Sequence, residues 1–157
     1  MAKVYLETSF VSYLVACRSR DLIMAARQQL TMDWWENERG KHELFISEMV
    51  LREARLGDPN EVAKRLKALS GLAQLDLTDE VAGLADQLLG KSILPAKAAR
   101  DAVHIAAATV HRMDYLLSWN FKHIANPHVR KMVDRVFLSL GYEPPLICTP
   151  EEMEEAQ

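Results

Sequence analysis

The sequence predicts an α/β protein with a mainly parallel sheet flanked by helices. Short apolar runs alternate along the chain with segments whose apolar residues repeat at helical spacing. Strands that alternate with helices in this way form βαβ units, in which successive strands run parallel. No internal repeat or linker interrupts the pattern, and 157 residues suffice for one domain with a buried core. We therefore predict a single domain over residues 1–150 and an acidic tail over residues 151–157.

Five short apolar runs predict the strands. The first, Lys3–Leu6, is followed by the polar residues Glu7, Thr8 and Ser9, which indicate a turn. The later strands are expected at Leu44–Ser47, Leu72–Leu77, Tyr115–Trp119 and Leu146–Thr149.

Helices are predicted between the strands from their apolar faces and their end signals. Ser47 is a suitable N-cap for a helix that runs to about Leu56, before Gly57, Asp58 and Pro59 break it. Thr78 and Asn126 are expected to cap two later helices, and the residues beyond Pro150 form a short helix or no regular structure. The expected inner faces are Ile23, Ala26, Leu30 and Trp34, with Gly40 closing that helix; Val62, Leu66 and Leu69; Val81, Leu84, Ala85 and Leu88; an alanine-rich stretch to about Arg112; and Val129, Val133, Val136 and Leu140.

The composition is that of a soluble globular protein, with 49% hydrophobic and 26% charged residues. No apolar run approaches the roughly 20 residues of a membrane-spanning helix, and the N-terminus lacks the pattern of a signal peptide. Cys17 and Cys148 lie far apart without a CxxC pattern, which argues against a zinc site and for two free thiols. We expect a cytoplasmic protein with no membrane contact.

Net charge does not decide whether the protein binds nucleic acid. The chain carries −3, but without the tail residues Glu151, Glu152, Glu154 and Glu155 it has 19 basic and 18 acidic residues, or +1. Phosphate binding depends on a local patch rather than on this total. Each of three basic clusters is either such a patch or a solvated helix face: Arg18 with Arg20; Lys64, Arg65 and Lys67; and residues 122–135.

Four polar side chains lie where predicted elements begin or end. Glu7 and Asn120 follow strands, whereas Glu53 and Asp101 lie on helices beside apolar positions. In a parallel sheet all four can reach the crevice at the carboxyl ends of the strands, where open α/β folds bind ligands. Clustered carboxylates repel one another unless a cation lies among them, and oxygen ligands suit Mg²⁺ or Mn²⁺. The pattern therefore favours a metal site formed by Glu7, Glu53 and Asp101 in a phosphodiester hydrolase.

Two hydroxyl groups adjoin this expected site. Ser9 and Ser118 lie next to the two strand ends and can orient a carboxylate or a metal-bound water. No histidine base is required, because a metal can supply the attacking hydroxide. His104 shares a helix face with Asp101 and is expected to be a partly buried helix residue rather than a ligand. Trp34, Trp35 and Trp119 are expected in the core or at a dimer surface.

Each candidate also has a structural interpretation. Glu7 could be a solvated surface charge, and Glu53 could pair with arginines on its own helix. Asp101 could serve only the helix dipole, and Asn120 is a common turn residue.

Four segments, in this order, resemble those of the PIN-domain ribonucleases, including the VapC-type toxins of bacterial toxin–antitoxin pairs. They are Val4–Ser9, the helix from Ser47 to Glu53, Asp101–Ala106 and Leu116–Asn120, and the likeness extends from Val4 to Thr149. The resemblance implies a three-layer sandwich with a mainly parallel sheet of four or five strands. It also implies a divalent-metal-dependent endoribonuclease that uses Mg²⁺ or Mn²⁺, forms a homodimer and binds a small antitoxin protein. By this resemblance the catalytic residues are Glu7, Glu53, Asp101 and Asn120, supported by Ser9 and Ser118.

The chain departs from the family pattern at two of these positions. The family usually has aspartate where this chain has Glu7, and commonly aspartate where it has Asn120. Glutamate can still bind a metal, but asparagine lowers the number of negative charges in the site from four to three. One metal ion is therefore expected rather than two.

Two other functions remain open on the sequence. A non-catalytic PIN-like module that binds RNA or protein is favoured by Glu7 and Asn120. A Rossmann-like enzyme for a small phosphorylated molecule is disfavoured, because no GxGxxG or GxxxxGK[ST] loop is present.

Overall fold

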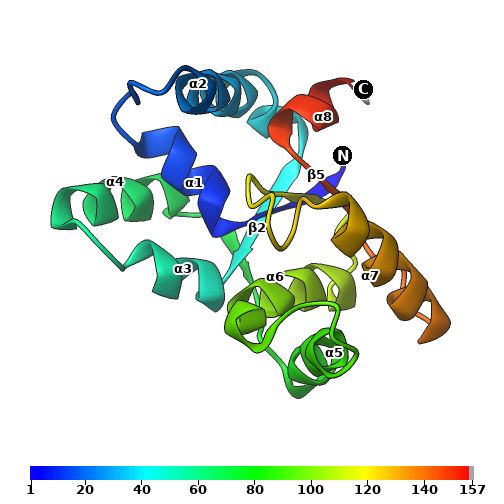
Figure 1. Ribbon diagram of the computed structural model, residues 1–157. Helices are drawn as coiled ribbons and strands as arrows, with labels where there is room; N and C mark the ends of the chain where they lie inside the picture. The colour runs from blue at the N-terminus through cyan, green and yellow to red at the C-terminus, as the bar shows by residue number, and fades with distance from the viewer. Residues whose placement is uncertain (156–157) are drawn as a thin grey trace.

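The computed structural model describes residues 1–155, and its centre is a five-stranded parallel sheet with helices on both faces (Figure 1). The strands are β1 (Lys3–Leu6), β2 (Glu43–Ser47), β3 (Ala73–Leu75), β4 (Tyr115–Leu117) and β5 (Leu146–Cys148). The helices are α1 (Thr8–Val15), α2 (Leu22–Asn37), α3 (Glu48–Ala54), α4 (Pro59–Leu69), α5 (Asp79–Gly90), α6 (Ala99–Val110), α7 (Pro127–Ser139) and α8 (Pro150–Glu155), with the short 3-10 turns Arg39–Lys41 and Ala96–Ala98. The predicted fold class is confirmed.

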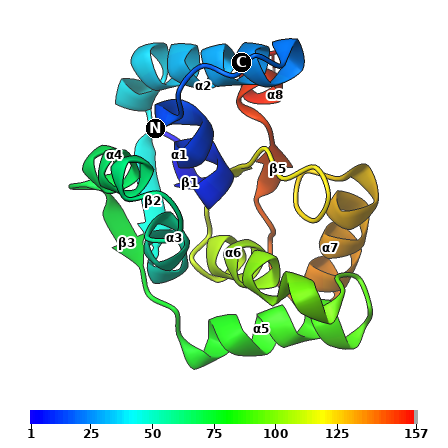
Figure 2. The ribbon, with the colours of Figure 1, turned by 60° about the vertical axis from the view of Figure 1, so that its left-hand side comes forward.

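The strands are arranged in the order β3-β2-β1-β4-β5. From β1 the chain builds outward to β2 and β3, then crosses to the other side of β1 to add β4 and β5. Right-handed crossovers in opposite directions put α1–α4 on one face and α5–α7 on the other. Figures 1 and 2 show α1 and α2 on the side opposite α5 and α6. The carboxyl ends of β1 and β4 therefore flank the point where the strand order reverses, which is where such sheets bind ligands.

The core lies on both sides of the central strands. Val4, Tyr5, Leu116 and Leu117 are fully buried, because β1 and β4 have neighbours on every side. On α6, alanine at positions 102 and 106–108 is fully buried, and such small side chains let this helix approach the sheet and α5 closely. None of the helices in residues 1–155 combines the length and the apolar character needed to span a bilayer.

The structure contains one helix that was not predicted from the sequence. Residues 8–15 form α1, where a turn was predicted after the first strand. Glu7, an uncommon N-cap residue, begins this helix by accepting a hydrogen bond from the Ser9 N–H at 2.6 Å. Phe10 and Val11 are buried, and Leu14 and Val15 pack against the core. This spacing of i, i+1, i+4 and i+5 is helical and was the available signal.

Two predicted helix faces were partly wrong. On α2 Ile23 is 63% exposed, and the buried residues are Gln28, Thr31 and Trp34. On α7 Leu140 lies just beyond the helix and is 45% exposed, whereas Phe137 is buried. The polar Gln28 and Thr31 are accommodated because their side chains bond to backbone groups and to Trp119. The strands predicted from Leu72, Tyr115 and Leu146 exist but are shorter than expected.

The predicted caps were mostly confirmed. The Thr78 hydroxyl accepts from the Val81 N–H, and the Asn126 side chain accepts from the N–H groups of His128 and Val129. Ser47 occupies the N-cap position of α3, but its hydroxyl bonds to the Tyr5 hydroxyl at 2.8 Å instead of capping the helix. Gly141 follows α7 with a φ of 86°, a conformation that glycine adopts without strain.

The acidic segment after Pro150 is helical in the part that the structure describes. Within α8 the Met153 side chain is fully buried, and the helix packs against α2. Glu152 forms a bidentate pair with Arg130 of α7, with both N–O distances at 2.9 Å. Residues 156 and 157 of the expected tail lie outside the described residues.

Candidate active site

Glu7 is placed between the two central strands. Its N–H donates to the Leu117 carbonyl at 3.1 Å, which ties the end of β1 to the end of β4. Its carboxylate accepts the Ser9 N–H and is only 4% exposed. Glu7 is therefore a buried group held by the sheet and by the start of α1, not a solvated surface charge.

Glu53 points toward the same region from α3. Its Oε1 atom accepts a hydrogen bond from the Thr8 hydroxyl at 2.7 Å and lies 2.5 Å from His104 Nε2. The arginines of this segment, Arg52 and Arg55, lie instead beside Glu48, at 3.9 and 3.2 Å. Glu53 is thus free of the ion pairs that its helix neighbours suggested.

Asp101 and Asn120 are joined by a hydrogen bond. Asp101 lies in the first turn of α6, and its Oδ1 atom accepts from Asn120 Nδ2 at 3.2 Å. The Asn120 carbonyl oxygen accepts the N–H groups of Lys122 and His123, at 3.2 and 3.0 Å. The oxygen of Asn120 therefore closes the turn after β4, and its amide nitrogen positions Asp101.

Ser9 and Ser118 stabilise the ends of the two strands. Ser9 Oγ accepts the Trp119 N–H at 2.8 Å, and Ser118 Oγ accepts the Asn120 N–H at 3.0 Å. The two hydroxyl oxygens are 3.3 Å apart. These contacts fix the backbone from which Glu7 and Asn120 project.

His104 has a larger role than its sequence position indicated. It is fully buried, and its Nδ1 atom lies 2.7 Å from the Tyr5 hydroxyl, which in turn bonds to Ser47. Its Nε2 atom bonds to Glu53. The i, i+3 spacing from Asp101 was the only signal in the sequence, and it did not reveal that β1 and α3 supply the partners.

The charges of these groups favour a protonated His104. Burial lowers the pKa of His104, but the bond to Glu53 and the charges of Glu7, Glu53 and Asp101 outweigh burial, so its pKa is raised. Both ring nitrogens then donate, Nε2 to Glu53 and Nδ1 to Tyr5. Burial also raises the pKa of the Tyr5 phenol, which keeps it neutral and able to donate to Ser47. The surrounding acidic groups thus favour the protonated form of His104.

The three carboxyl groups respond differently to this environment. Burial raises the pKa of Glu7 and of Asp101, although the His104 charge acts in the opposite direction on both. Burial also acts to raise the pKa of Glu53, but hydrogen bonds from His104 and Thr8 outweigh it, and the pKa is lowered. Glu53 is therefore the most firmly ionised of the three.

The three carboxylates have the chemistry of ligands for a hard divalent cation. Glu53 and Asp101 each use one carboxylate oxygen for the protein contacts given above, and Glu7 is bonded by both the N–H and the hydroxyl of Ser9. Such oxygens suit Mg²⁺ or Mn²⁺. In the described part of the chain no three His, Cys, Asp or Glu side chains lie close enough together to hold a metal ion as they stand. Binding would therefore require the mutually repelling carboxylates to rotate toward the cation.

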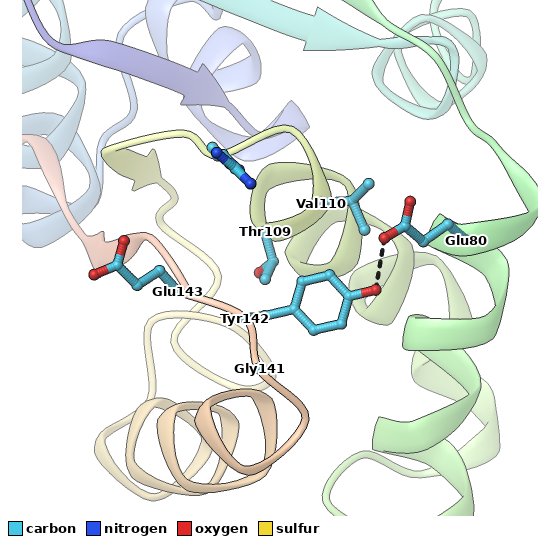
Figure 3. A pocket seen from close by; sticks show the side chains of 7 residues that line it. Glu80, Thr109, Val110, Gly141, Tyr142 and Glu143 are labelled. Carbon is cyan, nitrogen blue, oxygen red and sulfur yellow. Dashed lines mark hydrogen bonds between the residues drawn. The ribbon is translucent and has the colours of Figure 1, made fainter.

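A cavity of about 530 Å³ lies away from this site (Figure 3). It is found at the far end of α6, beside Thr109 and Val110, roughly 13 Å along the helix from Asp101 at 1.5 Å per residue. Figure 3 shows the Tyr142 hydroxyl pointing to the Glu80 carboxylate, at an O–O distance of 2.6 Å. The cavity contributes nothing to the carboxylate site.

Several basic residues of the predicted clusters have structural partners. Lys64 pairs with Glu61, Arg65 bonds to the Ala54 and Leu56 carbonyls, and Arg130 pairs with Glu152. Arg65 and Arg130 thus hold α4 and α7 to neighbouring segments, whereas the Lys64–Glu61 pair lies within α4. Cys17 and Cys148 are free thiols, one exposed and one buried.

Comparisons with known proteins identify the fold. The family model of the PIN domain matches residues 4–124. A chain from the crystal structure of VapBC2 from Rickettsia felis, bound to a promoter DNA fragment, is similar with a TM-score of 0.61 at 15% identity, covering 94% of this chain and 98% of that one. The sarcin-ricin loop cleaving toxin VapC20 of Mycobacterium tuberculosis is similar with a TM-score of 0.59 at 18% identity, covering 76% and 92%.

No curated protein sequence matches the chain. The family match nevertheless includes β1 and β4, the strands that flank the reversal of strand order. It also includes all four candidate residues, Glu7, Glu53, Asp101 and Asn120. The chain belongs to the PIN-domain family.

Proposed function

We propose that the protein is a divalent-metal-dependent endoribonuclease that hydrolyses RNA phosphodiester bonds. The observation that supports this most is that Glu53 bonds to His104, while Glu7 and Asp101 lie near enough for their charges to act on it, beside the point where the strand order reverses. A bound Mg²⁺ or Mn²⁺ ion would activate water and stabilise the charge that develops on the phosphate. In this proposal Glu7, Glu53 and Asp101 bind the ion.

The surrounding residues act by holding those carboxylates. The Ser9 N–H orients Glu7, the Thr8 hydroxyl and His104 orient Glu53, and the Asn120 amide orients Asp101. His104 also reduces the repulsion among the three carboxylates while no cation is bound. This arrangement lets one side chain, His104, stabilise a site whose net charge would otherwise oppose folding.

The biological role that we propose is the toxin of a toxin–antitoxin pair. The similarity to VapC20 and to a chain of the VapBC2 complex supports this role, because the first is described as a toxin and the second as part of a VapBC assembly. A homodimer in the cytoplasm and a small antitoxin partner belong to the same proposal. Co-purification with the product of the neighbouring open reading frame would test the antitoxin partner directly.

A second candidate is a non-catalytic PIN module that binds RNA or protein. It is favoured by the Asn120 oxygen, which accepts two backbone N–H groups and so is not offered to a metal. The two candidates differ in whether the purified protein cuts RNA.

The test is cleavage of an RNA pool by the purified protein with Mg²⁺ or Mn²⁺, with EDTA and the Asp101→Asn variant as controls. If a metal ion supplies the attacking hydroxide, as the family resemblance implies, we expect products with 5′-phosphate and 3′-hydroxyl ends. Cyclic 2′,3′-phosphate ends, or equal cleavage in EDTA, would contradict the proposed chemistry. No cleavage of any RNA by the metal-loaded protein would favour the non-catalytic module.

A further inference from the structure

A cluster of aromatic rings carries a cation beside the candidate site. The Trp119 ring is stacked on Tyr13, with centroids 5.7 Å apart and planes 9° from parallel, and it meets Phe121 edge to face at 6.0 Å. The Arg27 guanidinium of α2 lies 4.5 Å from the centroid of Phe121 and 5.9 Å from that of Trp119. Arg27 is thus held over aromatic rings by cation–π attraction.

Thr31 helps to fix the backbone of Arg27 relative to Trp119. Thr31, one turn along α2, is fully buried; its hydroxyl donates to the Arg27 carbonyl and accepts from Trp119 Nε1, each at 2.7 Å. This contact locks α2 to the loop after β4. The orientation of Arg27 therefore depends on the same loop that carries Asn120.

The Arg27 guanidinium has no acidic partner. Within residues 1–155 it forms no ion pair and donates no hydrogen bond. An arginine that stacks on a ring keeps its in-plane N–H groups available, and these match the two oxygens of a phosphate. Phe121 below it is 41% exposed, so the cluster is open to solvent.

The cluster directly adjoins the carboxylate site. Trp119 and Phe121 flank Asn120, which is bonded to Asp101, and the Trp119 N–H donates to Ser9 in the first turn of α1. A backbone that passes through the carboxylate site would thus bring a neighbouring phosphate within reach of Arg27.

We propose that Arg27, positioned by Phe121 and Trp119, binds a substrate phosphate adjacent to the scissile one. This subsite rests on the proposed ribonuclease function and adds to it a contact that reads the RNA backbone without selecting a base. Arg27 is a binding residue in this proposal, and Phe121 is a positioning residue.

The first experiment measures RNA binding as a function of salt. A fluorescein-labelled single-stranded RNA that the wild-type protein cuts is titrated with Asp101→Asn protein, which leaves the RNA intact, with and without Arg27→Gln. Removing one phosphate contact should lower the slope of log Kd against log salt by about 0.7. Affinity at low salt should fall roughly tenfold, the range expected for a charged hydrogen bond.

Arg39→Gln is the matched control. Arg39 also lies over an aromatic ring, 4.6 Å from the centroid of Trp35, but it precedes β2 and so lies at the amino ends of the strands, opposite the candidate site. We expect this variant to keep the wild-type slope and affinity. An equal loss in both arginine variants would overturn the proposal, because it would show only a general effect of charge.

The second experiment uses the active protein and separates binding from chemistry. Arg27→Gln should raise KM with little change in kcat, because the contact is made in the ground state and in the transition state alike. Phe121→Leu keeps the Arg27 charge but removes the ring that positions it. KM should therefore rise while the slope of log Kd against log salt stays near that of the wild type.

The possible failures can be told apart. Wild-type protein that cuts RNA, with Arg27→Gln unchanged in salt slope and in KM, would overturn the subsite and leave the proposed function intact. Wild-type protein that neither binds nor cuts RNA would overturn both.

Discussion

The Asn120 side chain joins Asp101 to the backbone of the turn after β4. Replacing Asn120 with aspartate should remove its bond to Asp101. In Asn120→Asp an oxygen replaces the nitrogen that donates to Asp101, so the metal-free protein should be less stable than wild type. The added charge should tighten Mg²⁺ or Mn²⁺ binding by about 1–2 kcal/mol, for a dielectric near 20 and a separation of several ångströms. Calorimetric titration of both proteins measures the second effect.

Asn126→Asp is the control for that substitution. Asn126 caps α7 through its side-chain oxygen, which aspartate can also do, and it donates from Nδ2 to the Phe121 carbonyl, so both variants add a charge and lose one amide donor. Its replacement should leave metal affinity unchanged. Equal or weaker affinity in Asn120→Asp would show that this position does not face the cation.

His104 should also contribute strongly to stability. In His104→Gln the Glu53 carboxylate loses its charged partner and the Tyr5 hydroxyl loses a buried neighbour. We expect the free energy of unfolding to fall by about 3 kcal/mol, as when a buried pair is broken. Urea denaturation measures it, with His111→Gln as control, because His111 makes one exposed bond to the Asp76 carbonyl. A similar loss in both variants would contradict the special role of His104.

At the scale of elements, the ion pair between Glu152 of α8 and Arg130 of α7 should stabilise the fold to a degree that depends on pH. Hydrogen bonds from Arg130 lower the pKa of Glu152, so the ionised carboxylate stabilises the folded protein. This contribution is complete above the ordinary pKa of 4.5 and is lost as the pH falls through the lowered folded value. Glu152→Gln should therefore be less stable than wild type at pH 7.

The stability difference between Glu152→Gln and wild type should shrink as the pH falls below 4.5, the ordinary value for this group. Denaturant midpoints at pH 7, 5 and 4 measure this trend. Gln can still accept from the Thr149 N–H, so the comparison measures the loss of the charge together with one acceptor for Arg130. A difference that is constant over this range would show that the pairing with Arg130 does not stabilise α8.

At the scale of the whole molecule, the proposed metal site predicts that metal binding and folding are coupled. The raised pKa of Asp101 means that its ionised form is less favourable in the folded protein than in the unfolded chain. Asp101→Asn should consequently raise the thermal midpoint in metal-free buffer at pH 7, through relief of burial and of repulsion from Glu53. It should also abolish the stabilisation that Mn²⁺ gives to wild type.

Thermal scans with and without Mn²⁺ test both effects. Asp86→Asn is a suitable control, because Asp86 is an exposed residue of α5. Retention of the full Mn²⁺ shift in Asp101→Asn would remove Asp101 from the metal site.

Local patterns in the sequence determined the fold class and the positions of the candidate residues. All five strands exist where apolar runs were found, and caps such as Thr78 and Asn126 act as their residue types predicted. The parallel alternation also predicted that Glu7 and Asn120 would lie at one edge of the sheet, because parallel strands end on the same side. These features depend on residues close together in the chain.

Only the tertiary structure decided which side chains are partners. The α1 helix begins at a glutamate, and α2 buries Gln28 and Thr31 rather than Ile23, because the neighbouring loop and Trp119 supply hydrogen bonds that no local pattern encodes. His104 has a partner at each ring nitrogen because β1 and α3, about 100 and 50 residues away, bring Tyr5 and Glu53 to it. Burial and pairing are properties of contacts between distant segments, which is why no local pattern in the sequence revealed the bonds of Glu53 to His104 and of Asn120 to Asp101.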